Sequence, residues 1–202
     1  MALIYVTLQQ EISKVFNSAN SVYKNCDEYM ATRCSQVIHD YIIQGQVATV
    51  DGGTGSKGGV YVGAGVGTMN INTQLLANLF KTTFLSKSSN YELARRIADN
   101  IQTVFTLPNT INTNSSGMST LPPPSSVVYP DFCTGKGTFS GVNTVIFTKL
   151  VACFNSMNKM TKNGNMYFAQ EWAKAIDEYL KMGQISVTLQ APIVGTGTGK
   201  IA

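Results

Sequence analysis

The chain has 202 residues, of which 44% are hydrophobic, enough for one domain or two small domains with a real core. Charged residues make up only 13% of the chain, and a net charge of +4 is too small and too scattered to indicate nucleic-acid binding. The N-terminal stretch lacks the features of a signal peptide, and no apolar run approaches the roughly 18 residues of a membrane span. We therefore expect neither a membrane segment nor export, and a protein that is made in the cytoplasm of its host.

Two amphipathic helices are predicted at the start of the chain. Leu8, Ile12 and Phe16 follow one another at intervals of four, which places them on one helix face. A second row has intervals of three, four and three: Ala31, Cys34, Ile38 and Tyr41. The polar segment between the two rows contains turn and capping residues, so the pair is predicted to be a helical hairpin. Gly45 fits the C-terminal cap of the second helix, and the segment GQVATV that begins there is predicted to be a short strand.

Glycine at alternate positions follows this helical pair. Residues 51–60 are predicted to be a flexible glycine loop, and after them come Gly63, Gly65 and Gly67. Alternate residues of an extended strand lie on the same face, so one face of this strand would be bare backbone. Such a face allows another backbone or an aromatic ring to approach closely.

A weaker copy of the same pattern occupies the middle of the chain. Its two apolar rows keep the spacings of the first copy: Leu76, Phe80 and Phe84, then Ala94, Ile97, Ile101 and Val104. Residues 107–134 are rich in proline, serine and asparagine, and they include Pro122, Pro123 and Pro124. Long irregular segments in a compact domain are usually functional or disordered. This segment is interpreted either as an arm lying on a neighbouring protein or as a mobile surface loop.

The third copy is the clearest. Residues 153–188 align without a gap with residues 15–50, and 12 of the 36 aligned positions are identical, where chance predicts about two or three. The identical residues of the first copy are Phe16, Asn17, Ser18, Asn20, Lys24, Asn25, Tyr29, Ala31, Ile38, Tyr41, Gly45 and Gln46. Alternate glycines return at the end of this copy as Gly195, Gly197 and Gly199. The predicted units are therefore 1–69, 70–140 (with the arm 107–134) and 141–202.

These patterns predict a mainly α fold with short β segments. Three tandem αα-hairpin units would each be followed by one short glycine-rich strand, packed side by side or around a pseudo-threefold axis. The strands would leave an exposed edge, and such an edge invites pairing with another chain. We therefore expect the strands to join sheets across subunits.

No motif in the sequence predicts catalysis. The only histidine, His39, adjoins Asp40, but adjacent residues of a helix point in different directions. The segments 52–59 and 195–200 are glycine-rich, but neither has the spacing of a phosphate-binding loop followed by a helix. The four cysteines include no CxxC pair. The sequence therefore predicts a protein that is not an enzyme, with no cofactor and no metal site.

Helical hairpins that end in Gly-Gln-Val or Gly-Gln-Ile and lead into GxGxG tracts resemble uncharacterised structural proteins of tailed-phage virions. Few charges, abundant asparagine, threonine and glycine, and long arms agree with this resemblance. It implies a structural subunit of the virion in the capsid, neck or tail, whose partners are copies of itself and other virion proteins. The candidate assembly contacts are Gly63, Gly65, Gly67, Gly195, Gly197, Gly199, Pro122, Pro123 and Pro124.

Two other functions are compatible with the sequence. A module that binds a small apolar ligand or a peptide between its helical repeats would have one large pocket containing Trp172 or several tyrosines. An enzyme would need His39, or a carboxylate pair such as Asp27/Glu28 or Asp177/Glu178, to lie in a cleft.

Overall fold

The computed structural model describes residues 3–19, 21–22, 24–86 and 88–202. The elements are, in chain order, α1 (Tyr5–Ala19), α2 (Cys26–Ile42), β1 (Val47–Thr54), β2 (Val60–Met69), α3 (Thr73–Leu85), α4 (Asn90–Phe105), β3 (Ile111–Thr120), β4 (Val128–Ser140), α5 (Thr144–Met157), α6 (Gly164–Met182), β5 (Gln184–Leu189) and β6 (Val194–Ile201). The order helix–helix–strand–strand therefore occurs three times along the chain.

The strands form a closed antiparallel barrel in the order β1-β2-β3-β4-β5-β6, with β6 paired back to β1. The predicted fold of helical hairpins that are each followed by one short strand is wrong, because each helix pair is followed by a β-hairpin and the hairpins close into a single barrel. Every described strand is paired on both sides, so the exposed strand edges expected to join sheets across subunits are not present in the described part of the chain.

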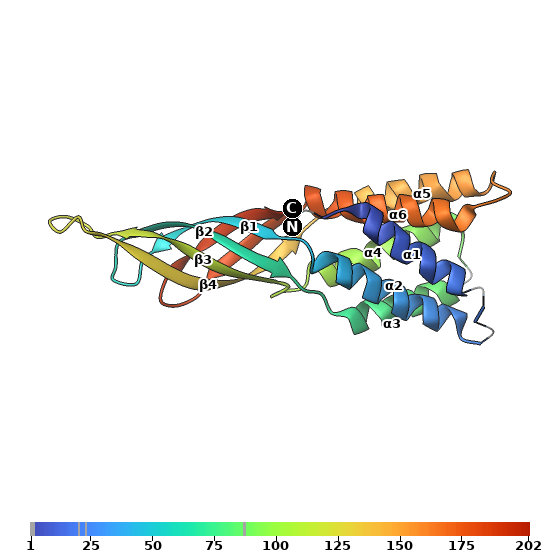
Figure 1. Cartoon of the computed structure of the whole chain (residues 1–202), viewed down its shortest axis with the longest axis horizontal. Helices are drawn as coiled ribbons and strands as arrows, with labels where there is room; N and C mark the ends of the chain where they lie inside the picture. Colours follow the sequence, from blue (N-terminus) through green and yellow to red (C-terminus); the bar gives the residue numbers. More distant parts are fainter. Residues whose placement is uncertain (1–2, 20, 23, 87) are drawn as a thin grey trace.

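The six described helices form a ring next to the barrel. Each helix packs against its neighbours in the chain, and α6 returns to pack against α1. Figure 1 shows the helical ring and the barrel end to end along the longest axis, with both chain ends at the junction between them. One cluster of buried hydrophobic residues extends from all six described helices into the barrel, so the three units share one core.

The apolar rows of the sequence face the centre of this ring. The third copy has the same first-helix row, Ile146, Leu150 and Phe154. The middle residues of the three rows, Ile12, Phe80 and Leu150, are fully buried. The middle unit begins its helices with side-chain caps, because Asn72 accepts from the backbone N–H of Leu75 at 2.9 Å and Ser89 accepts from that of Glu92 at 3.3 Å. The caps therefore fix where these two helices begin, and the apolar rows determine which face each helix buries.

The barrel has glycines and other small residues on part of its inner face and several valines outside. Along β2, Gly63, Gly65 and Gly67 face inward between the buried Tyr61 and Met69, and Val62, Ala64 and Val66 alternate with them on the outer face. A barrel of so few strands has a narrow interior, because barrel diameter grows with strand number. A Cβ atom at Gly67 would collide with the backbone carbonyl oxygen of Asn112 on β3. Glycine at position 67 is therefore what allows β2 to approach its neighbour β3 this closely.

The segment 107–134 is not an irregular arm. Most of it belongs to β3 and β4, which pair in register from Ile111↔Gly137 to Thr120↔Val128. The turn 121–127 between them projects furthest from the helices, as the yellow tip of Figure 1 shows. The glycine loop expected at 51–60 is likewise shorter, since β1 continues to Thr54 and β2 begins at Val60.

Candidate functional site

The glycines named as candidate assembly contacts lie on the inner wall of the barrel. Gly65 and Gly197 are buried there, and Gly63, Gly67, Gly195 and Gly199 are half-buried. The close approach that they allow takes place within the chain, against backbone or side chains of the strands on either side. Pro122, Pro123 and Pro124 are exposed in the β3–β4 turn. Of the predicted contacts, only the prolines are thus presented to the outside, and the outer barrel wall consists of the residues that alternate with the glycines.

That outer wall carries exposed apolar side chains on five strands, with threonine, serine and asparagine residues paired to several of them. We define the barrel patch as Val50, Val60, Val62, Val66, Met118, Val128, Phe132 and Val194, each of which is about half exposed or more. Val62 is paired across the strands with Met118, and Met118 with Pro130. Phe132, which is 65% exposed, stands two residues beyond Pro130 on the same face of β4. Large contiguous apolar patches on a protein surface are typical of binding sites.

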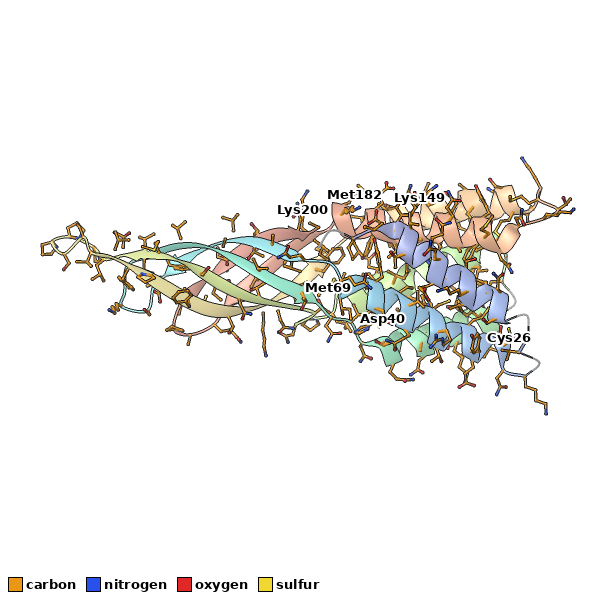
Figure 2. The ribbon with its side chains drawn as sticks, viewed as in Figure 1. Cys26, Asp40, Met69, Lys149, Met182 and Lys200 are labelled. Carbon is orange, nitrogen blue, oxygen red and sulfur yellow. The ribbon has the colours of Figure 1, made fainter. Side chains whose placement is uncertain are left out.

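Charge is almost absent around the barrel patch. The outward-facing residues of the described strands include two charged side chains, Lys136 and Lys200, and both lie towards the helical half of the barrel. Figure 2 shows Lys200 at this junction. Lys57, in the β1–β2 turn, lies over the ring of Tyr129 at 4.9 Å from its centroid. The far half of the barrel therefore presents a nearly neutral surface to any partner.

A second candidate site is a cavity at the end of the helical ring that is furthest from the barrel. Its volume is about 270 Å³, and it lies near Cys26, which Figure 2 labels. Phe16, Phe84 and Phe154, the last residues of the three first-helix rows, line it together. The second helices contribute equivalent positions: Met30, Leu93 and Phe168. We call this cavity the end pocket; it is assembled from all three units.

Trp172 lies next to the end pocket and is fully buried. Its ring centroid is 5.3 Å from that of Phe168 and 6.5 Å from that of Phe16, and both phenylalanines line the pocket. The described lining contains neither Trp172 nor a tyrosine. The end pocket therefore differs from the large pocket with Trp172 or several tyrosines that the ligand-binding hypothesis predicts, because phenylalanines and Met30 form its apolar wall.

The residues considered for catalysis make structural contacts. Nε2 of His39 lies 3.0 Å from Oδ1 of Asn70, which joins the end of α2 to the segment after β2. Tyr41 donates to Oδ1 of Asp177 at 2.7 Å, and Lys181 donates to Oδ2 at 2.9 Å. Burial, and then the hydrogen bond to Asp177, raise the pKa of Tyr41 far above its usual range. These contacts tie elements together, but Tyr41 also lines a pocket of about 160 Å³ with Asp40, and Asp27 of the other carboxylate pair lines the end pocket.

Neither a membrane span nor a metal cluster occurs in the described residues. None of their helices combines the length and the apolar character that are needed to cross a membrane. They also include no group of three or more histidine, cysteine, aspartate and glutamate residues placed to hold a metal ion.

Comparisons with known proteins give no match. No family model fits the chain, and neither the curated proteins nor the solved structures include a similar one.

Proposed function

We propose that this protein is a non-enzymatic structural subunit of a tailed-phage virion, a capsid-associated, neck or tail component that acts by assembly. The observation that carries the proposal is the barrel patch, a set of exposed apolar side chains on the outer faces of five strands of a barrel that has almost no outward charge. The helical ring and the base of the barrel share one hydrophobic core, and the barrel projects from the ring along the longest axis (Figure 1). The partners are other copies of the chain and neighbouring virion proteins.

The hydrophobic effect favours burial of the barrel patch against a partner. Burying a valine or phenylalanine side chain contributes about 1.5–3 kcal/mol, and leaving eight such residues in water favours association. Outward Lys57, Lys136 and Lys200 flank the patch rather than interrupt it. A partner surface that binds the barrel would therefore be apolar and uncharged at its centre, with polar or acidic groups at its edge.

Removing two side chains from the barrel patch is expected to prevent self-association. Size-exclusion chromatography with light scattering should show assemblies larger than the 21.8 kDa chain for the wild type. The double variant Val62→Ser with Phe132→Ser should elute as a monomer, because losing about 3 kcal/mol of apolar burial weakens association at least about 100-fold.

The matched control is Met166→Ser with Met182→Ser, which removes exposed apolar side chains from the helices. This variant should assemble like the wild type. A wild-type protein that stays a monodisperse monomer over the whole concentration range would contradict the structural proposal.

The end pocket favours a second candidate function, the binding of a small apolar ligand or of an apolar peptide side chain. Drug-sized ligands occupy pockets of about 300–1,000 Å³, so a cavity of about 270 Å³ fits a smaller aromatic molecule or one large side chain. Phenylalanines from all three units supply its apolar wall, and Asp27 and Asn165 supply polar groups.

Titration with the neutral dye N-phenyl-1-naphthylamine tests this function. Trp172 is the only tryptophan and adjoins the pocket, so a bound dye should quench it by energy transfer. Leu93→Gln places an amide in the pocket wall and should weaken binding about tenfold, because the unpaired amide loses its hydration. Val62→Gln, on the barrel patch, should leave the tryptophan signal unchanged. Equal quenching in the wild type and Leu93→Gln would exclude the end pocket as the binding site.

A further inference from the structure

The interior of the barrel contains a group of polar atoms that lack partners. Among the described strand residues, the buried side-chain oxygen atoms without a hydrogen bond are Oγ1 of Thr49, both carboxyl oxygens of Asp51, the hydroxyl of Tyr61, Oγ1 of Thr113 and Oγ of Ser115. All five residues face inward on β1, β2 and β3, and Asp51 is only 2% exposed. Buried polar atoms are usually hydrogen-bonded, so this group needs an explanation.

Three of these oxygen atoms converge above Gly65. A Cβ atom built on Gly65 would lie 2.7 Å from Oγ of Ser115, 2.8 Å from Oδ2 of Asp51, and nearer still to Oγ1 of Thr49. Ser115 pairs with Gly65 from one side, and Thr49 pairs with it from the other. Glycine at position 65 therefore leaves room for oxygen atoms from two strands to face a common point inside the barrel.

Asp131 is a second buried carboxylate of the barrel, and hydrogen bonds compensate for its loss of hydration. Its Oδ2 accepts from the backbone N–H of Ser56 and from Oγ of Ser119, each at 2.8 Å. Burial alone would raise its pKa, but these hydrogen bonds outweigh burial and hold the pKa of Asp131 below its usual value. Asp51 is as deeply buried and has no such donor among the described residues. An ionised carboxylate in that position needs compensation, either from hydrogen-bond donors, as at Asp131, or from a positive charge beside it.

We propose that Asp51, Thr49 and Ser115 bind one monovalent hard cation, Na⁺ or K⁺, inside the barrel. The ligands are all oxygen atoms, which hard cations prefer over the softer ligands of transition metals. A single carboxylate neutralises a single positive charge, whereas a divalent ion would leave a net charge in the interior. Asp51 is only 2% exposed, and this burial strengthens the attraction between the cation and its carboxylate. This site is independent of the assembly role of the outer wall.

Thermal unfolding in different salts tests the site. The wild type and Asp51→Asn are compared in NaCl, KCl, CaCl₂ and tetramethylammonium chloride at one ionic strength and one pH. A cation that binds only the folded chain raises the Tm of the wild type by about 5–10 °C at about 100 times its Kd. We expect this rise in NaCl or KCl relative to tetramethylammonium chloride, and we expect Asp51→Asn to have the same Tm in all four salts.

Asp40→Asn removes an equal charge from a surface carboxylate that is 52% exposed, and this control should keep the wild-type salt dependence. If Asp51→Asn does not fold, Thr49→Val serves instead, with a reduced response to Na⁺ or K⁺. Elemental analysis after gel filtration in tetramethylammonium buffer should find Na⁺ or K⁺ retained by the wild type. A wild-type Tm that is equal in all four salts, or that rises in CaCl₂ alone, would overturn the proposal.

Discussion

Replacing Gly67 by alanine is expected to lower the free energy of unfolding by about 3 kcal/mol, the upper part of the range for an overpacked interior. The added Cβ would collide with the carbonyl oxygen of Asn112 and lie 2.7 Å from Cα of Thr113. Both are backbone atoms of a paired strand, so no side-chain rotation relieves the clash. For a chain of this length the corresponding fall in Tm is about 6–12 °C. Urea unfolding followed by circular dichroism measures the effect.

Gly52→Ala provides the matched control for this experiment. Gly52 belongs to the same barrel but is exposed, and the nearest atom to an added Cβ is the carbonyl oxygen of Tyr61 at 3.9 Å. Alanine there should leave stability unchanged or raise it by up to about 1 kcal/mol, because it restricts the unfolded chain. If both variants unfolded at the same urea concentration, the inner wall of the barrel would not be tightly packed at Gly67.

Trp172→Ala is expected to cost about 3–5 kcal/mol, the usual cost of truncating a large aromatic side chain in a core. The indole ring is fully buried and contacts the rings of Phe80, Phe168 and Phe16, so alanine would leave a cavity between the three units. The loss of Trp172 removes the fluorescence signal, and far-ultraviolet circular dichroism during urea unfolding gives the measurement.

Tyr91→Ala is the control for the truncation. Tyr91 is 59% exposed and makes one edge-to-face contact with Phe147, at 5.1 Å between ring centroids. Its removal should cost no more than about 1 kcal/mol. A loss for Trp172→Ala that is no larger than the loss for Tyr91→Ala would mean that the helical ring is not packed around the indole.

The helices and part of a candidate site were predictable from the sequence. Rows such as Leu76, Phe80 and Phe84 have the period of a helix face, and the structure buries that face. The last residues of the three first-helix rows are Phe16, Phe84 and Phe154, and they line the end pocket. Because equivalent residues of a closed ring lie around its axis, the shared aromatic character of these row ends is a signal in the sequence that indicates the pocket.

The barrel was not predictable in the same way, because its hydrophobic pattern is mixed. Strand prediction expects apolar residues on the buried face, but the middle of β2 buries glycines between Tyr61 and Met69 and exposes Val62 and Val66. In β3, the inward Thr113 and Ser115 alternate with outward Asn112 and Asn114, so no apolar alternation is present at all. β-Propensity depends strongly on the neighbouring strands. The pairing of β3 with β2 and β4, which a sequence pattern cannot show, decides its conformation.

Asp51 illustrates the same limit at a single residue. The sequence Asp-Gly-Gly is typical of a turn, because aspartate and glycine are the usual turn residues. In the structure Asp51 is instead paired with Gly63 on one side and with Gly197 on the other. Glycines on both neighbouring strands make space for its carboxyl group, since a Cβ atom at Gly197 would overlap Oδ1 of Asp51. The residues that allow this position are distant in sequence.

Three similar units on one chain form an object that is nearly, but not fully, symmetric about its long axis. A ring made from three separate copies would look the same in three directions and would come apart on dilution. Here the three units belong to one chain, and the β3–β4 hairpin extends beyond the β1–β2 and β5–β6 hairpins. Such a molecule can lie on a threefold axis of a larger assembly, and its longer hairpin still distinguishes one of the three units from the other two. A partner that contacts the longer hairpin would therefore bind one copy per ring rather than three.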